Sequence, residues 1–306
     1  MNVFVVLQQM LVLLTMMALG YLTYRKGWIN DESYGHISKI CVNILNPCIV
    51  IYGVTGKDSN LPGQVVVQNL IFMCIYYVIL ILLSKPIIRM LKVSKGNRSI
   101  YELMLIFSNV GFMGIPVISS IFGQESVVLI AFYMLGYNLV LYTYGLYLSS
   151  KTEGAQITFQ WKSLLNAGVI SCIVALLLFG FQVQLAPSVV NFFDYVGNAV
   201  VPMSMMLIGA SVAQHADRSF LTDIRMYVFS AIKLLVIPIA AALLMKGFAI
   251  DPLVKGVFVM MLAMPVGTIV VMFAKQAGAD DMECTKGSVI TTLLSIVTIP
   301  IVAAFL

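Results

Sequence analysis

The sequence predicts an all-α integral membrane protein whose ten transmembrane helices form two inverted halves of five. Three observations lead to this fold class. The chain of 306 residues is 60% hydrophobic and 10% charged, whereas a soluble domain is about 25% charged. Its apolar residues gather into ten runs of spanning length, and its basic residues gather on one side of those runs. The net charge of +5 is therefore interpreted as a topology signal and not as a nucleic-acid-binding surface.

Ten apolar runs define the expected spans, because about 20 apolar residues in a helix cross a hydrocarbon core of roughly 30 Å. The runs lie at residues 3–24, 35–54, 64–84, 100–122, 126–149, 163–182, 188–213, 224–248, 254–276 and 287–305. The first run has no basic residue before it and is followed by Arg25 and Lys26. A secretory signal has the reverse polarity, so we expect this run to be retained as the first span.

The distribution of Lys and Arg sets the expected orientation. With the N-terminus outside, the connections on the cytoplasmic side contain fourteen basic residues and those on the opposite side contain three, Lys57, Lys246 and Lys255. Cytoplasmic connections carry the excess of basic residues. We therefore expect a multi-pass protein of the inner (plasma) membrane with both termini on the outer, periplasmic side.

The connection from Ser149 to Trp161 divides the spans into residues 1–150 and residues 151–306. Each half contains five spans, and an odd number requires that a structural repeat be inverted across the membrane. Short motifs recur at an offset of 155 residues, or one residue from it. The matched positions are Asn43-x-x-x-Pro47 with Asn198-x-x-x-Pro202, Gly111 with Gly267, and Gly123 with Gly278. We expect breaks at Asn43, Pro47, Asn198 and Pro202 in the second and seventh helices.

Two spans contain helix-breaking residues near their middle. In the fourth span these lie within Ser108-Asn109-Val110-Gly111-Phe112-Met113-Gly114-Ile115-Pro116, and in the ninth within Met264-Pro265-Val266-Gly267. One interpretation is an ordinary kink, since Gly and Pro are common in membrane helices. Irregular backbone at membrane depth is otherwise tolerated where it is buried in protein or lines a wet cavity. Its recurrence in both halves favours a binding site.

The break in each span exposes a half-helix N-terminus, which attracts anions without a Lys or Arg side chain. Pro265 ends the helix before it, because proline lacks an N–H and clashes with the preceding turn. Asn109 adds an amide that can donate to a carboxylate, and Asn138 lies halfway along the fifth span. Asn138 is equally typical of an interhelical hydrogen bond. The Ser and Thr stripe of the tenth span, from Ser288 to Thr298, is more typical of helix packing.

Few residues are available for chemistry inside the spans. Glu102 and Lys233 lie within predicted helices close to the cytoplasmic side, where they could form an intramembrane charge pair or extend to the surface. The five cysteines show no CxxC motif, and the two histidines are far apart in sequence. We expect no metal, no cofactor and no catalytic residue.

These residues resemble the auxin efflux carrier family, which includes the plant auxin carriers and bacterial malate permease-like proteins. The resemblance covers essentially the whole chain. Besides the two interrupted segments, it is carried by Tyr137-Asn138, Phe273-Ala274-Lys275 and Leu294-Ser295-Ile296-Val297-Thr298-Ile299-Pro300. It implies a fold like that of sodium/proton antiporters and bile acid transporters, with broken helices four and nine crossing.

The resemblance also implies how such a protein would work. Helices 1, 2, 6 and 7 would form a scaffold domain that pairs in a homodimer, and helices 3–5 and 8–10 a transport domain that moves like an elevator. The residues expected around the substrate are Asn109, Gly111, Asn138, Pro265, Val266 and Gly267, and the helix break would also include Ser108, Gly114 and Pro116. Ser108 replaces a proline and Val266 a glutamine of the plant carriers.

The leading hypothesis is a secondary transporter of a small organic anion, a carboxylate, embedded in the lipid bilayer. The alternative is a cation-coupled symporter or cation/proton antiporter of the same architecture. That alternative requires ionisable residues at the crossing, where the sequence has asparagines. An intramembrane enzyme is disfavoured because the spans contain no Ser–His, Cys–His or paired-Asp combination.

Overall fold

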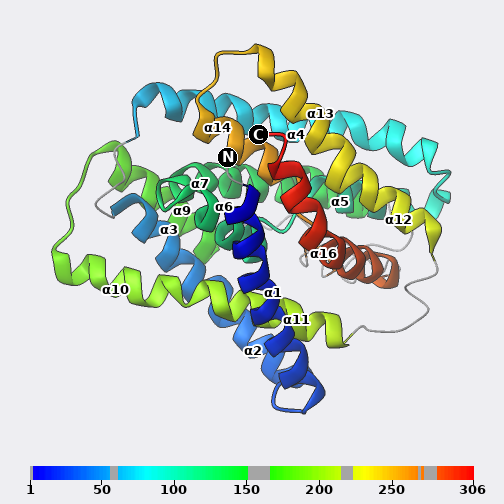
Figure 1. Cartoon of the computed structure of the whole chain (residues 1–306), viewed down its shortest axis with the longest axis horizontal. Coiled ribbons are helices and arrows are strands. Elements are labelled where there is room, and N and C mark those ends of the chain that lie inside the picture. The colour runs from blue at the N-terminus through cyan, green and yellow to red at the C-terminus, as the bar shows by residue number, and fades with distance from the viewer. Residues whose placement is uncertain (1–2, 56–60, 151–165, 215–222, 268–269, 272–280) are drawn as a thin grey trace.

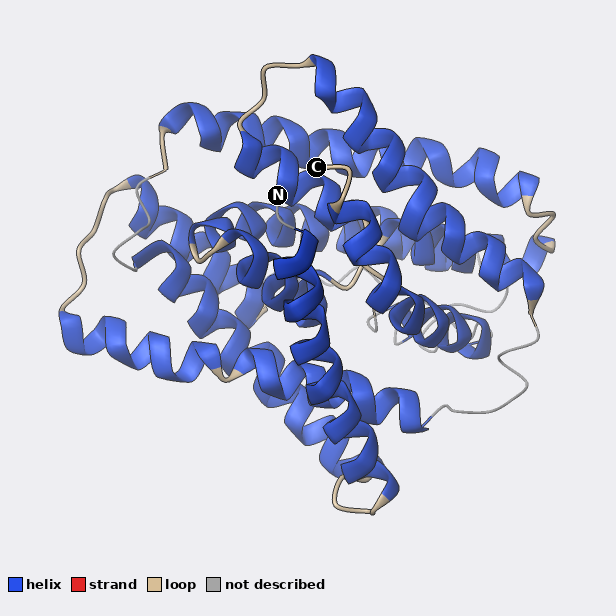
Figure 2. Cartoon of the chain, viewed as in Figure 1, coloured by secondary structure: helices blue, strands red, loops and turns tan. Residues whose placement is uncertain are grey.

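The computed structural model describes residues 3–55, 61–150, 166–214, 223–267, 270–271 and 281–306. Nearly all of these residues are helical, and the helices cross one another at many angles (Figure 1). Within the described ranges, the single β-type pairing is an isolated antiparallel bridge between Ser108 and Val266. It is too short to be drawn as a strand in Figure 2.

The helices follow the order of the predicted runs. Those of the first half are α1 (Val3–Arg25), α2 (Asp31–Ile40), α3 (Asn46–Thr55), α4 (Gly63–Met90), α5 (Arg98–Ile106), α6 (Ile115–Phe122), α7 (Glu125–Val140) and α8 (Leu146–Ser150). Those of the second half are α9 (Ala167–Gly180), α10 (Pro187–Asn198), α11 (Val200–Gln214), α12 (Ile224–Ala231), α13 (Ile237–Leu244), α14 (Pro252–Leu262) and α16 (Asp281–Ala303).

The helices confirm the prediction of an all-α integral membrane protein. Seven helices of the described residues are long and apolar enough to cross a bilayer, and three shorter apolar helices lie at Val110–Phe122, Ala167–Gly180 and Pro252–Leu262. Helix α4 extends past its apolar run to Met90, so its last turns include basic residues that were expected in a connection. The count of ten spans and the inverted repeat stay predictions.

Among the described helices, α1 and α11 pack most extensively against each other, and they cross in Figure 1. A Cβ atom built on Gly209 would lie 1.8 Å from the carbonyl oxygen of Met17, and one built on Gly20 would lie 2.0 Å from that of Met206. Helix α3 packs against α9 and α10, and α4 packs against α5, α7 and α14. The glycines allow backbones to touch, which is the usual way that membrane helices associate.

The breaks expected at Asn43–Pro47 and Asn198–Pro202 are smaller distortions in the structure. Residues Cys41–Leu45 form a π-helical turn that continues into α3, so Asp31–Thr55 remains one helix. Between α10 and α11, Ala199 alone leaves the helix, and Pro187–Gln214 remains one span. A π turn contains one extra residue, and a proline lacks the N–H of one helical hydrogen bond, so each distortion bends the helix without ending it.

Candidate functional site

The two interrupted segments meet each other in the structure. Helix α5 ends at Ile106 and α14 ends at Leu262, and non-helical residues follow each of them. The N–H of Asn109 donates to the carbonyl of Pro265 at 2.8 Å, and the N–H of Gly267 donates to the carbonyl of Phe107 at 2.9 Å. These bonds flank the bridge between Ser108 and Val266. Each segment therefore satisfies backbone groups that the other has freed from its helix.

Side chains complete this pairing from the last helix. The N–H of Val266 donates to Thr291 Oγ1 at 3.0 Å, and Thr291 is fully buried. Ser295 Oγ, one turn later, donates to the carbonyl of Thr292 at 2.6 Å and lies 3.7 Å from Met113 Sδ. Together with Ser288 and Thr298, these residues are all at most 7% exposed. The polar stripe of α16 thus packs against the crossing, in agreement with its interpretation as a helix-packing surface.

Gly267 is required at the crossing because the two backbones touch there. A Cβ atom at this position would lie 3.0 Å from the carbonyl oxygen of Ser108 and 3.1 Å from that of Phe107. Both are backbone atoms held by hydrogen bonds, so neither can move without weakening the pairing. A larger residue would separate the segments.

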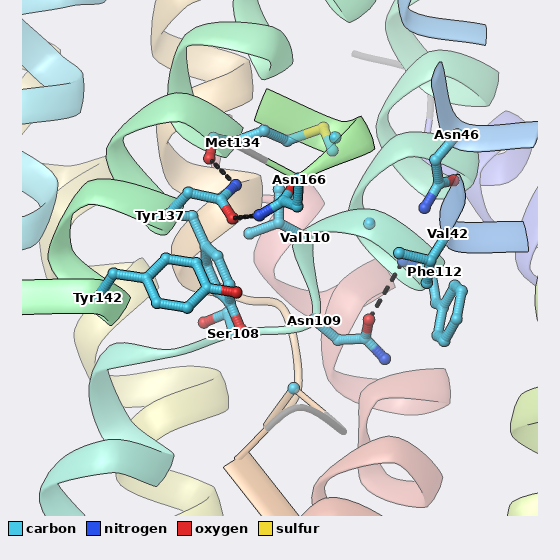
Figure 3. A pocket seen from close by; sticks show the side chains of 14 residues that line it. Val42, Asn46, Ser108, Asn109, Val110, Phe112, Met134, Tyr137, Tyr142 and Asn166 are labelled. Carbon is cyan, nitrogen blue, oxygen red and sulfur yellow. Dashed lines mark hydrogen bonds between the residues drawn. The ribbon is translucent and has the colours of Figure 1, made fainter. Parts of the chain in front are cut away.

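Asn109 begins the helix that leaves the crossing. Its Oδ1 accepts from the backbone N–H of Phe112 at 3.2 Å, which is a helix N-cap (Figure 3). This bond fixes the orientation of the amide, and Nδ2 then has no hydrogen-bond partner. The side chain is only 5% exposed. A buried amide nitrogen without a partner is costly and is uncommon in folded proteins.

A cavity of about 230 Å³ lies directly against the crossing. Its polar side chains come from several helices, as Figure 3 shows. They are Asn46, Ser108, Asn109, Tyr137, Asn138, Tyr142 and Asn166. Two glycines of the interrupted segments, Gly111 and Gly267, also line it. No acidic or basic side chain is among the described residues of its wall.

The asparagines on the far wall hold each other in place. Asn138 Nδ2 donates to the carbonyl of Met134 at 2.7 Å, and Asn138 Oδ1 accepts from Asn166 Nδ2 at 3.1 Å. Asn166 Oδ1 in turn accepts from the N–H of Val169 and caps α9. Sequence reasoning missed Asn166, although an Asn just before an apolar helix is a recognisable N-cap signal.

Asn46, the first residue of α3, was also missed, and it lines the cavity. It is 5% exposed, and its Oδ1 has no hydrogen-bond partner. Its Nδ2 would lie 3.2 Å from a Cβ atom at Gly111. Asn43, which the repeat pattern had singled out, is exposed and bonds only to the carbonyl of Lys39, at 2.9 Å. The other repeat asparagine, Asn198, is exposed and bonds to Asp194.

The structure therefore brings together only part of the expected site. Ser108, Asn109, Gly111, Asn138 and Gly267 line the cavity. Pro265 and Val266 contribute backbone bonds but no wall, and the Val266 side chain is fully buried behind the crossing. Gly114 and Pro116 lie at the start of α6, where the N–H of Gly114 donates to the carbonyl of Asn109 at 2.9 Å.

The predicted pair of Glu102 and Lys233 is wrong, because the two side chains have different partners. Glu102 Oε2 accepts from the hydroxyl of Tyr144 at 3.0 Å. Lys233 is 1% exposed, and its Nζ donates to the carbonyl of Leu105 and to Ser108 Oγ, both at 2.9 Å. Lys233 therefore does not extend to the membrane surface either. Among the described residues, no group of three His, Cys, Asp or Glu side chains could hold a metal ion.

Comparison with known proteins places this architecture among transporters. The sequence profile of a family described as "Membrane transport protein" matches residues 5–158 and 155–303. An uncharacterised transporter of Methanothermobacter thermautotrophicus is 25% identical over 307 residues, which cover 96% of each chain. An uncharacterised transporter of Methanocaldococcus jannaschii is 24% identical over 306 residues, which cover 94% of this chain and 95% of the relative.

Proposed function

The chain belongs to the membrane transport protein family, the family of the auxin efflux carriers, and on that premise we propose that it is a secondary transporter of a small organic anion, most simply a carboxylate. One observation carries the proposal. The amide nitrogen of Asn109 is buried, has no partner and belongs to a residue that lines the cavity at the crossing. A carboxylate oxygen is a strong acceptor that would satisfy it.

The surroundings of Asn109 favour an anion over a cation. The described wall of the cavity contains no carboxylate, and its polar groups are amides and hydroxyls. Asn109 caps the beginning of the helix that leaves the crossing, where the backbone N–H groups carry partial positive charge. A volume of about 230 Å³ is below the roughly 300–1,000 Å³ that is typical of sites for drug-sized ligands. The proposed substrate is therefore small.

The proposed mechanism is alternating access of the elevator type. Asn46 and Asn166 belong to helices of the expected scaffold domain, whereas Asn109 and Asn138 belong to helices of the expected transport domain. A cavity between these two groups is consistent with a substrate that moves with one group relative to the other. In this proposal the interrupted helices α5–α6 and α14 are the crossing pair of an inverted repeat of ten spans.

The proposed setting is the inner membrane, with both termini outside and a homodimer formed through the scaffold helices. The charge bias of fourteen to three supports this orientation. The dimer rests on the resemblance to the auxin efflux carriers.

A thermal-shift screen of the detergent-purified protein against mono- and dicarboxylates tests the proposal. Each acid is compared with its carboxamide, which has similar size but no charge. A specific anion at a hundredfold excess over Kd should stabilise the protein by about 2.7 kcal/mol, and its carboxamide should not. If no carboxylate stabilises the protein, the proposal fails.

The same binding measurement, applied to three variants, distinguishes the anion proposal from the cation-coupled alternative. That alternative is favoured if Asn109→Ala and Asn138→Ala leave substrate binding intact and Glu102→Gln abolishes it. The anion proposal expects Asn109→Ala and Asn138→Ala to weaken substrate binding and Glu102→Gln to leave it intact.

A further inference from the structure

Lys233 is a buried basic side chain that does not itself line the cavity. It lies in a π-helical turn, Ile232–Val236, between α12 and α13. Its side chain is 1% exposed and crosses to the end of α5, where Nζ donates to Leu105 O and Ser108 Oγ. A methionine of similar length would fill the same space without bringing a charge into the interior.

Among the described residues, no carboxylate forms an ion pair with Lys233. In the described parts of the chain, the salt bridge that forms is between Glu283 and Lys286, and none reaches Lys233. The two recorded partners of Lys233 are neutral oxygens. A buried charge without a counter-charge costs several kcal/mol. An anion bound by the protein would therefore supply the missing counter-charge.

Lys233 Nζ also lies at a position that favours a bound cation. Leu105 lies in the last turn of α5, where carbonyl oxygens carry partial negative charge. In transporters with interrupted helices, unwound carbonyls and half-helix C-termini are where coupling Na⁺ ions bind. A carbonyl and a hydroxyl oxygen are ordinary ligands for such a hard cation. Here the lysine nitrogen already occupies that position.

Ser108 connects Lys233 to the cavity. An ammonium group can only donate, so Ser108 Oγ is the acceptor in the bond with Lys233 and keeps its own hydrogen to donate. The hydroxyl of Tyr76 lies 3.2 Å from Ser108 Oγ and 3.4 Å from the carbonyl of Met261, at the end of α14. Ser108 lines the cavity beside Asn109. One network thus joins both half-helix C-termini, the lysine and the cavity.

We propose that Lys233 is a tethered cation that takes the place of a coupling Na⁺ ion, so that the anion binds without sodium. This inference rests on the proposed function, because it assumes an anionic substrate. It assigns Lys233 as the residue that sets the charge preference of the site through Ser108. Ser108 Oγ lies 2.9 Å from Lys233 Nζ, so a carboxylate that accepts a hydrogen bond from Ser108 would place its charge at most about 7 Å from the lysine. At an effective dielectric constant of about 20, that separation corresponds to about a fiftyfold change in Kd.

The test measures binding of the carboxylate found in the screen by calorimetry, in sodium chloride and in choline chloride. The proteins are the wild type, Lys233→Ser and the control Lys246→Ser. Lys246 is an exposed residue just after α13, so its replacement removes one positive charge outside the site. The Ser variant leaves the oxygens of Leu105 and Ser108 open to an added Na⁺ ion.

The proposal expects the wild type and Lys246→Ser to bind within twofold in the two salts. It expects Lys233→Ser to bind about fiftyfold more weakly in choline and to recover in sodium, which a merely structural role would not produce. Two results overturn it: a wild type whose binding falls tenfold or more in choline, or a Lys233→Ser protein that is insensitive to sodium. The wild-type comparison stands even if the variant does not fold. A wild type that binds no carboxylate in either salt refutes the proposed function instead.

Discussion

Asn109 makes two contributions that substitutions can separate, a structural one through its oxygen and a proposed binding one through its nitrogen. The oxygen caps the helix by accepting from Phe112, and the nitrogen has no partner. Asn109→Ala removes both contributions. Asn109→Asp keeps an oxygen for Phe112, removes the donor and adds a negative charge at the place proposed for the substrate.

The magnitudes follow from these contacts. Loss of an N-cap costs about 0.5–2 kcal/mol of stability, so Asn109→Ala should lower the free energy of unfolding by about 1 kcal/mol and Asn109→Asp should not. A hydrogen bond to a charged group contributes about 1.5–3 kcal/mol, which corresponds to a ~10- to ~150-fold change in Kd for Asn109→Ala. Asn109→Asp should lose more than this, because two carboxylates would then face each other.

The assay is calorimetric titration of the carboxylate together with the melting temperature of each variant. Asn43→Asp is the matched control, since Asn43 is an exposed asparagine with a local bond to Lys39. The reasoning is refuted if Asn109→Asp binds the carboxylate within twofold of the wild type while folding normally. It is also refuted if Asn43→Asp loses binding to the same degree.

Three further predictions concern the backbone crossing, the helix interface and the topology. Gly267→Ala should destabilise the protein by about 1–3 kcal/mol, seen as a lower melting temperature, because its Cβ would meet the carbonyl oxygen of Ser108 at 3.0 Å; an unchanged melting temperature would show that the two segments are not held together. Gly209→Ala should lower the melting temperature more than Gly267→Ala does. Gly35→Ala, with nothing within 4 Å of its Cβ, should instead stabilise α2 by about 0.5–1 kcal/mol. Equal effects of Gly209→Ala and Gly35→Ala would argue against close packing of α1 and α11. A reporter fused after Leu306 should read as periplasmic, and a cytoplasmic signal there would contradict an even number of spans with the N-terminus outside.

The sequence signals that led to the predicted crossing are local. Proline lacks an N–H and glycine alone permits backbone contact, so Pro265 and Gly267 marked a break without knowledge of the fold. The meeting of the two breaks followed from their matching positions in the two halves. In the structure, the two segments are joined by the hydrogen bond from the N–H of Asn109 to the carbonyl of Pro265.

The walls of the cavity were harder to predict because they depend on which helix face turns inward. The repeat pattern marked Asn43 as a helix break and did not point to Asn46. The π-helical turn at Cys41–Leu45 contains an extra residue, which changes the register of the helix faces. Asn46 then points to the crossing and Asn43 to the outside. A period of 3.6 residues per turn does not anticipate this rotation.

The partners of Glu102 and Lys233 were mistaken for a related reason. The sequence showed only that both charges lie within spans on the cytoplasmic side, and opposite charges at similar depth suggest a pair. In the structure, Lys233 bonds to the end of α5 and Glu102 bonds to Tyr144. Contacts between helices that are far apart in sequence depend on helix packing, which hydropathy does not encode.

Uptake of the labelled carboxylate into proteoliposomes tests the central claim most directly. With a potential set by potassium and valinomycin, moving one negative charge toward the positive side gains about 2.3 kcal/mol per 100 mV. We predict that an interior-positive potential drives accumulation of the anion in wild-type vesicles, and that vesicles with Asn109→Asp remain at the level of protein-free ones. Equal uptake by wild-type and Asn109→Asp vesicles, or no uptake of any carboxylate that binds, would contradict the account.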